Sequence, residues 1–398
     1  MFASMIVKTN ILDNLRYKVV IPLMAFSAGT IVANVYYSQP ILKNIAETLN
    51  KSEDAVGRIS MLAQLGYGLG MFFLLPLGDK INRKKLIITI CCSLVLMLLL
   101  TTLTEKLNIL LVLSFLIGVC STPAQIILPM AATLGKENRG KNVGIVFSGI
   151  LCGILGSRLI SGWLTDLWGW QSVYVFSALL VSVSIISLFF FLPEVPIRFK
   201  GNYSDLLKST IILIKKYEVL RQASLLGAFT FGVFCSFWTT LTFHLSGDPF
   251  NYSASTIGLF GIIAIGGALV APFFGKMADK GHVFKNLFLT VGLLIGSIVA
   301  MLVFPYSLWV LIVSIFFLDI GAQATQITNF TRIYSLNEDA HSRLNTVYMT
   351  TYFIGAGVGT FFGLLSWSIG GWIFALSQML LWSSIALIIV WLSSKNKL

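Results

Sequence analysis

Charged residues are scarce in this chain: only 11% of its 398 residues are Asp, Glu, Lys or Arg, whereas 56% are hydrophobic. Soluble globular proteins carry roughly 25% charged residues, so this shortage excludes an ordinary soluble domain. Histidine and cysteine are scarce as well, with three and five residues. No two histidines have the spacing of zinc ligands, and all five cysteines fall inside apolar runs, where they build no disulfide framework. We therefore expect no metal site, no cofactor and no catalytic residues.

Long hydrophobic runs are abundant instead. A helix needs roughly 20 apolar residues to cross the hydrocarbon core of a bilayer, and the chain contains twelve such runs. They predict an all-α membrane protein, in which each span satisfies its own backbone polar groups. The predicted spans are residues 18–40, 55–77, 86–104, 107–134, 142–165, 170–192, 219–243, 255–276, 285–304, 307–332, 343–365 and 370–393.

The net charge of +12 is distributed unevenly along the chain. With a cytoplasmic N-terminus, almost all of the 28 Lys and Arg residues lie before the first span, in alternate loops and at the C-terminus. This positive-inside pattern predicts that both termini are cytoplasmic. The excess positive charge then reflects topology, and we expect no nucleic-acid partner. The exceptions, on the outer side or within a span, are Lys43, Lys51, Arg58, Lys106 and Arg158.

A set of landmarks recurs at an offset of about 200 residues. With six spans in each repeat, this predicts two pseudo-symmetric six-helix bundles of the same orientation, related by an axis along the membrane normal. The predicted units are residues 1–192 and 219–398, joined by a linker at residues 193–218. The repeated landmarks are Gly57 and Gly258, Asp79 and Asp279, Gly118 and Gly321, and the Gly-Trp pairs at 169–170 and 371–372.

The linker contains a stretch with helical periodicity, "NYSDLLKSTIILIKKYE". It predicts an amphipathic helix on the cytoplasmic leaflet, where its lysines are attracted to anionic lipid. A plain flexible tether is the alternative. The expected apolar face consists of Leu206, Leu207, Thr210, Ile211 and Ile214.

Four stretches carry a resemblance to a known family: "ANVYYSQPIL" (33–42), "PLGDKINRKK" (76–85), "LDIGAQATQITNFTRIYSL" (318–336) and "SRLNTVYM" (342–349). Together with the two six-span repeats, they resemble the major facilitator superfamily. The stretches are similar to its bacterial arabinose-efflux-permease-like or drug:proton antiporter-like branch. This resemblance covers essentially the whole chain and implies a secondary transporter with twelve transmembrane helices.

The hairpin after the second span is similar to the loop motif of that superfamily. Topology explains its cations but not its carboxylate, and the resemblance implies that this acid contacts the start of the eleventh helix and holds the cytoplasmic side closed. Negative charge is favoured at a helix N-terminus. Leu75 and Asn82 stand where the motif has glycines, and Arg83 has Glu137 as an alternative partner. The expected gate residues are Asp79, Lys80, Arg83, Lys84, Glu137 and, in the second repeat, Asp279 and Lys280.

Asp319 is the one acidic residue deep inside a predicted span. A lone intramembrane carboxylate is costly and is functional by default, so we expect Asp319 to carry a proton, with a structural ion pair or packing hydrogen bond as the alternative. Arg158 is the other intramembrane charge. It either pairs with Asp319 or extends to the outer headgroups.

Polar and aromatic faces on several spans predict a mostly neutral, aromatic-lined binding pocket. Each of these residues is equally compatible with helix packing. The candidate substrate-binding residues are Asn34, Tyr37, Ser121, Gln125, Trp238, Gln323, Gln326, Tyr348 and Tyr352.

The sequence therefore predicts secondary active transport of a small organic solute across the bacterial inner membrane, by rocking of two bundles in a monomer. Export driven by protons is the expected direction. The alternatives are proton-coupled or facilitative uptake of a nutrient such as a sugar, amino acid or siderophore. A polytopic membrane enzyme is a rival of another class, but no catalytic constellation is visible.

Overall fold

The computed structural model describes residues 19–134, 139–195, 201–337 and 340–395, and only the backbone for some residues of these ranges, most of them between 265 and 279. Within these ranges the chain forms helices and no strands. The first helix spans residues 19–32 and continues through two 3₁₀ turns. The helices that follow are α2 (Leu42–Leu49), α3 (Glu53–Lys80), α4 (Arg83–Thr102), α5 (Leu107–Cys120), α6 (Pro123–Thr133), α7 (Arg139–Trp168), α8 (Gln171–Phe191), α9 (Tyr203–Lys216), α10 (Glu218–Ser246), α11 (Ala254–Asp279), α12 (Val283–Val303), α13 (Leu308–Tyr334) and α14 (His341–Lys395).

The twelve predicted spans correspond to these helices, with three differences in continuity. The first run is interrupted by the 3₁₀ turns η1 (Ala33–Val35) and η2 (Gln39–Ile41), the second of which contains Pro40. The fourth run is divided into α5 and α6, because Pro123 begins the second piece and cannot donate a backbone hydrogen bond. The last two runs are joined in α14, whose backbone leaves the helical conformation at Gly370 and Gly371.

The repeated Gly-Trp pairs have the same backbone role in both halves. Gly169 and Gly371 adopt positive φ angles of 81° and 64°, which only glycine adopts without strain. The tryptophan that follows each one is buried, with Trp170 2% and Trp372 5% exposed. The glycine therefore turns the chain between two antiparallel spans, and the tryptophan anchors the start of the second.

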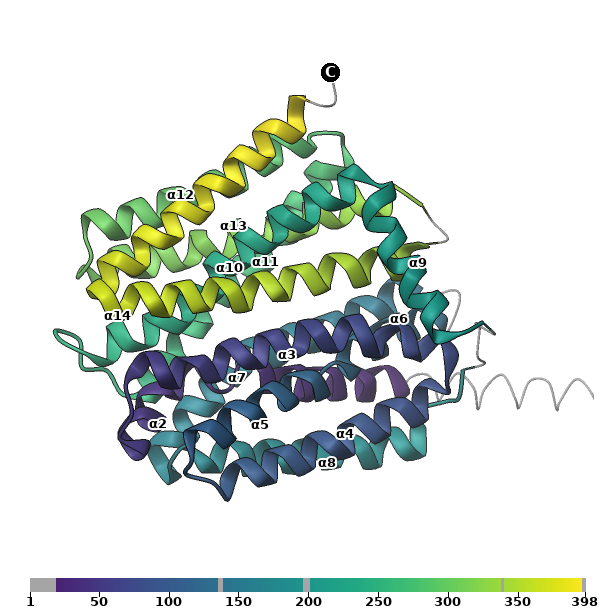
Figure 1. The fold of residues 1–398 in the computed structure, drawn as a ribbon, viewed down its shortest axis with the longest axis horizontal. Helices are drawn as coiled ribbons and strands as arrows, with labels where there is room; N and C mark the ends of the chain where they lie inside the picture. The colour runs from purple at the N-terminus through teal and green to yellow at the C-terminus, as the bar shows by residue number, and fades with distance from the viewer. Residues whose placement is uncertain (1–18, 135–138, 196–200, 338–339, 396–398) are drawn as a thin grey trace, which may run out of the picture.

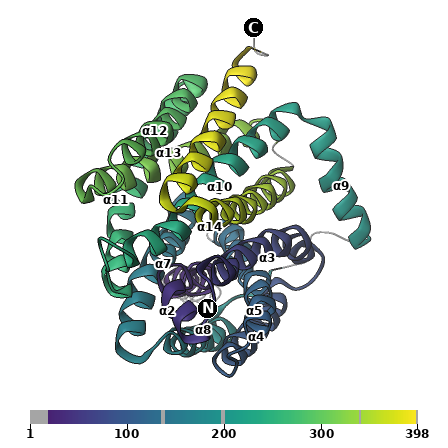
Figure 2. The same ribbon diagram turned by 60° about the vertical axis from the view of Figure 1, so that its left-hand side comes forward.

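The helices form two halves that lie against each other (Figures 1 and 2). The first half runs to α8 and the second from α10 to α14. The most extensive contacts between them are made by two helix pairs, α3 with α14 and α7 with α11. Glycines permit close approach at both: a Cβ atom on Gly57 would collide with Leu364, and one on Gly258 with the backbone of Arg158. Since Gly57 and Gly258 are repeat equivalents, the two interfaces are pseudo-symmetric copies.

The outward surface of the bundle is apolar, as expected for contact with lipid tails. Large hydrophobic side chains are exposed on helices of both halves, including Leu179, Phe190, Phe273 and Val303. Ten helices in the described ranges are long and apolar enough to cross a bilayer. The exposed apolar surface would be unstable in water and is stable in a membrane.

The predicted linker helix is present as α9, which connects the halves at one end of the bundle (Figure 1). Its buried face differs from the predicted one: Leu206 and Thr210 are buried as expected, but Leu213 replaces Ile211, which is 44% exposed. The reason is that α9 packs against α3, α10 and α14. Tyr203 donates a hydrogen bond from its hydroxyl to the Phe73 carbonyl oxygen in α3 at 2.5 Å.

We call the end of the bundle that carries α9, the α3–α4 hairpin (residues 79–85) and the start of α14 the basic end. The other end, with the α7–α8 and α10–α11 connections, is called the opposite end.

Candidate functional site

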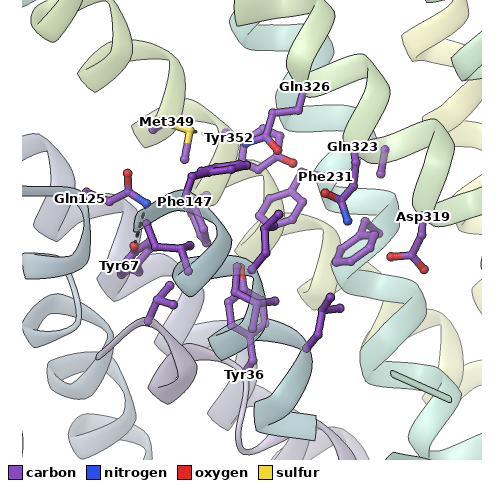
Figure 3. Close-up of a pocket in the computed structure, with 18 of the residues that line it drawn as sticks. Tyr36, Tyr67, Gln125, Phe147, Phe231, Asp319, Gln323, Gln326, Met349 and Tyr352 are labelled. Atoms are coloured by element: carbon purple, nitrogen blue, oxygen red, sulfur yellow. Dashed lines mark hydrogen bonds between the residues drawn. The ribbon is translucent and has the colours of Figure 1, made fainter. Parts of the chain in front are cut away.

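A cavity of about 90 Å³ lies between the two halves. Its lining comes from the first helix and its following turn, α3, α6 and α7 in the first half, and from α10, α13 and α14 in the second. Figure 3 shows how side chains from both halves converge on this space. We call it the central cavity.

Aromatic rings from both halves form a large part of the lining of the central cavity (Figure 3). The rings of Phe231 and Tyr352 stack with centroids 3.9 Å apart, and Tyr67 meets Phe353 edge to face at 4.6 Å. Tyr36 adds a further ring to the lining. Such rings offer a large apolar surface with little conformational freedom to lose on binding.

Three glutamines provide neutral polar groups in this lining. Gln125 donates a hydrogen bond from Nε2 to the Tyr67 hydroxyl at 3.2 Å. Gln323 and Gln326 lie on α13 with Asp319, and all three line the cavity. The polar stripe predicted from the i, i+4, i+7 spacing therefore faces the space between the halves (Figure 3).

Asp319 is completely buried in the described structure, with 0% exposure. Neither of its carboxylate oxygens has a hydrogen-bond partner among the described residues. A lone carboxyl group without a partner is costly inside a membrane span, which makes Asp319 a candidate functional group.

Arg158 lines the same cavity from α7 and is 1% exposed, so it does not extend to the outer headgroups. Its Nε and Nη2 groups donate to Gln39 Oε1 at 3.2 and 3.1 Å. The guanidinium lies over the Trp238 ring, with Cζ 4.0 Å from the centroid. Among the described ion pairs, none joins Arg158 to Asp319. The two opposite charges share a cavity without contact in this conformation.

The other predicted pocket residues do not line the central cavity. Asn34 donates to the Thr30 and Ile31 carbonyl oxygens and accepts from Ser177, and Ser121 donates to the Ile117 carbonyl oxygen. Their polar groups are therefore used within the first half. Tyr37, Trp238 and Tyr348 are buried but do not line the cavity. The Trp238 ring lies against the Arg158 guanidinium.

Sequence reasoning missed several residues that shape the site, above all Tyr36, Tyr67, Phe231 and Gln39. The aromatic residues gave no distinct signal, because aromatic side chains are common in all of these spans and their type does not show which of them face the cavity. Gln39 gave one, as an amide inside an apolar run beside Pro40.

A larger cavity, of about 730 Å³, lies at the basic end. Gln125 lines both this space and the central cavity, so the two meet at that residue. The wall also includes Asp79, Arg83, residues of α9 and the first residues of α14. The bundle therefore has a wide space between its halves at this end.

Two of the predicted gate residues in the first hairpin, Asp79 and Arg83, pair with each other. Arg83 Nη2 lies 2.5 Å from Asp79 Oδ1, and Arg83 Nε donates to the Gly78 carbonyl oxygen at 2.9 Å. Lys84 lies 5.7 Å from the centre of the Phe189 ring, and Lys80 is partly buried at the end of α3. Lys280 is exposed; Glu137 and the Asp279 side chain lie outside what the structure describes.

At the opposite end, hydrogen bonds join the two halves directly. Asp166 at the end of α7 accepts from the Ser255 backbone N–H at 2.9 Å, and Glu53 at the start of α3 accepts from Trp367 Nε1 at 2.8 Å. Lys43 donates to the Ser246 carbonyl oxygen. The central cavity is thus closed off at this end and approached from the basic end.

A cavity between two repeated halves, with membrane-spanning helices around it, defines a polytopic membrane transporter. The model of the Major Facilitator Superfamily matches residues 24–360. The chain belongs to this family, and its members of this type are transporters and not enzymes.

Individual relatives agree with this assignment. The uncharacterized transporter YgaY of Escherichia coli O157:H7 is 38% identical over 353 residues, which cover 88% of this chain and 90% of that protein. Multidrug resistance protein D of Escherichia coli K12 is 26% identical over 178 residues, covering 42% and 43% of the two chains. The solved structure of the human organic anion transporter MFSD10 (TETRAN) has the same fold, with a TM-score of 0.70 at 14% identity over 95% of this chain and 99% of that one.

Proposed function

We propose that this protein exports small organic solutes by alternating access, driven by protons. The observation that carries the proposal is the central cavity, which both halves line and which is approached only from the basic end in the described structure. A site of this kind serves transport when the halves, residues 1–192 and 219–398, rock as units and close one end while opening the other.

The basic end is assigned to the cytoplasm, with the protein a monomer in the bacterial inner membrane. Support comes from the charge distribution, because Lys80, Arg83, Lys84, Lys216 and Arg343 all lie at this end. The described conformation is then open to the cytoplasm. The exposed Ile211 and Ile212 of α9 support contact of that helix with the cytoplasmic leaflet.

Closure of the cytoplasmic side is assigned to the first hairpin. Asp79 and Arg83 line the basic-end cavity together with His341, Ser342 and Arg343 at the start of α14. When the halves approach, the Asp79 carboxylate would move from Arg83 to the free N–H groups of that helix start, where negative charge is favoured. Asp279 and Lys280 are assigned the equivalent role in the second repeat.

Proton coupling is assigned to Asp319. A carboxyl group that is buried, without partners and next to the binding space can be protonated and deprotonated as water reaches it from one end or the other.

Export is supported by one relative whose name denotes multidrug resistance. Uptake together with protons is a second candidate, because Arg158 and Asp319 line the same cavity. An anionic substrate and a proton could then bind at the same time.

Inside-out vesicles with an imposed pH gradient test the proposal. Solute accumulation that depends on acid inside the vesicle supports proton-driven export. Accumulation only in right-side-out vesicles supports uptake. Transport at a rate that does not depend on the pH gradient rejects proton coupling. Asp54→Asn, in an exposed ion pair with Arg58, is a control with unchanged transport.

A further inference from the structure

Arg158 carries a positive charge that no described ion pair neutralises. The described pairs are Lys43–Glu47, Arg58–Asp54 and Arg83–Asp79, all within one helix or hairpin. A buried cation without a counter-ion is strongly unfavourable. The rings of Trp238, Tyr36 and Phe234, at 4.0, 5.7 and 5.8 Å from Cζ, compensate only part of this cost.

The guanidinium of Arg158 is fixed in orientation, but some of its N–H donors have no partner among the described residues. Two of its five N–H groups donate to Gln39 Oε1, and the Trp238 ring supports its face. Nη1 is buried and has no hydrogen-bond partner among the described residues. The edge formed by Nη1 and the second N–H of Nη2 therefore remains for a ligand, and this edge matches the two oxygens of a carboxylate.

The charges of the lining decide how many negative charges such a ligand carries. Among the residues that the structure describes, Arg158 and Asp319 are the charged ones that line the central cavity. When Asp319 is protonated, Arg158 contributes a charge of +1, which one anionic group neutralises. A dianion would leave an excess negative charge in the membrane interior, and a cation would add to the existing positive charge.

We propose that the substrate is an organic monoanion whose carboxylate binds the free edge of Arg158, with its apolar body among Phe231, Phe234 and Tyr352. This assignment of substrate class rests on the proposed transport function and, because the anion binds while Asp319 is protonated, it fits the uptake candidate, in which substrate and proton are carried together. Arg158 is then the residue that selects for negative charge, and Gln39 is a positioning residue that holds the guanidinium.

Binding to purified full-length protein tests the proposal without any proton gradient. The probes are 3-phenylpropionate, 3-phenylpropionamide and 3-phenylpropylammonium, which share one apolar body and differ in charge. Two further sets carry the same three functional groups, one on a shorter benzene-based body and one on an indole-based body. Calorimetry is expected to show that at least one anion binds about tenfold or more tighter than its amide and its amine, as a charge-assisted hydrogen bond predicts.

Variants then locate the selectivity. Arg158→Gln is expected to remove the preference for the anion, and Arg158→Lys to keep part of it, because lysine retains the charge but not the planar edge. Asp319→Asn is expected to bind the anion at least as tightly as the wild type. Arg58→Gln changes a half-exposed arginine and is the matched control with unchanged affinity.

Three outcomes overturn the proposal: an amine that binds more tightly than its anion, no anion that binds the wild type, or Arg158→Gln protein that elutes as the wild type and keeps the anion preference. The ligand series in the wild type decides the question even if both Arg158 variants misfold. Proton-driven transport of neutral or cationic solutes would reject this substrate class alone, whereas Arg158-dependent anion binding without transport would reject the transport function alone.

Discussion

At the scale of single residues, the burial of Asp319 leads to a direct prediction. Asp319→Asn keeps the size and hydrogen-bonding capacity of the side chain but cannot gain or lose a proton, so we expect it to abolish proton-driven accumulation. Exchange of labelled solute across the membrane without a gradient should persist. The measurement compares gradient-driven uptake with equilibrium exchange in the same vesicles. Loss of neither would show that another group carries the proton.

Gly371 gives a second prediction at this scale. Its φ of 64° and ψ of −147° lie in a region that is almost restricted to glycine. A Cβ atom there would meet no neighbour within 4 Å, so Gly371→Ala tests backbone strain alone. We expect a loss of about 1–3 kcal/mol in stability, seen as a lower melting temperature in detergent.

Gly292 is the matched control, because it lies inside α12 and a Cβ atom there would also meet no neighbour within 4 Å. Gly292→Ala is expected to raise stability by up to about 1 kcal/mol, the difference in helix propensity. Equal effects of the two alanines would argue against the strained turn between the last two spans.

The residues of the cavity also show which features a sequence can predict. Asp319, Gln323 and Gln326 could be predicted, because polar groups at helical spacing stand out in an apolar span. Tyr36, Tyr67 and Phe231 could not, because one apolar face of a membrane helix meets lipid and the other meets protein, with no difference in residue type. Asn34 and Ser121 looked equally polar, but their groups satisfy carbonyl oxygens within the first half.

At the scale of helices, α9 separates two kinds of apolar residue in one element. Leu213 is 7% exposed and packs into the bundle, whereas Ile212 is 59% exposed. Leu213→Ala should lower the stability by about 2 kcal/mol or more, as is usual for buried leucine. Ile212→Ala should have little effect in detergent. Thermal unfolding measures both, and a larger effect of Ile212→Ala would contradict the packing of α9.

The helices also show why boundaries are harder to predict than spans. Hydrophobic length alone identified each crossing, since lipid requires it. The breaks within the first and fourth runs depend on Pro40 and Pro123, and the turn in α14 depends on Gly371. These residues determine local backbone geometry without changing mean hydropathy, so they are invisible in a count of apolar residues.

At the scale of the whole molecule, the repeat of about 200 residues predicted the pseudo-symmetric halves. The sequence could not predict which end is open, because that depends on contacts across the halves. Asp166 with Ser255 and Glu53 with Trp367 join the halves at one end, while the 730 Å³ cavity separates them at the other. The two hydrogen bonds are repeat equivalents of each other. One is made by the start of α3 and the other by the start of α11, the corresponding helix of the second half.

Distances between spin labels at the two ends test the central claim, alternating access, most directly. One pair is placed at the exposed Lys85 and Lys280 of the basic end, and the other at the exposed Lys106 and Asp248 of the opposite end, each in a cysteine-free background. The account predicts that conditions which shorten the first distance lengthen the second, and that Asp79→Asn favours the conformation with a long first distance. Two distances that stay constant, or that lengthen together, would contradict alternating access.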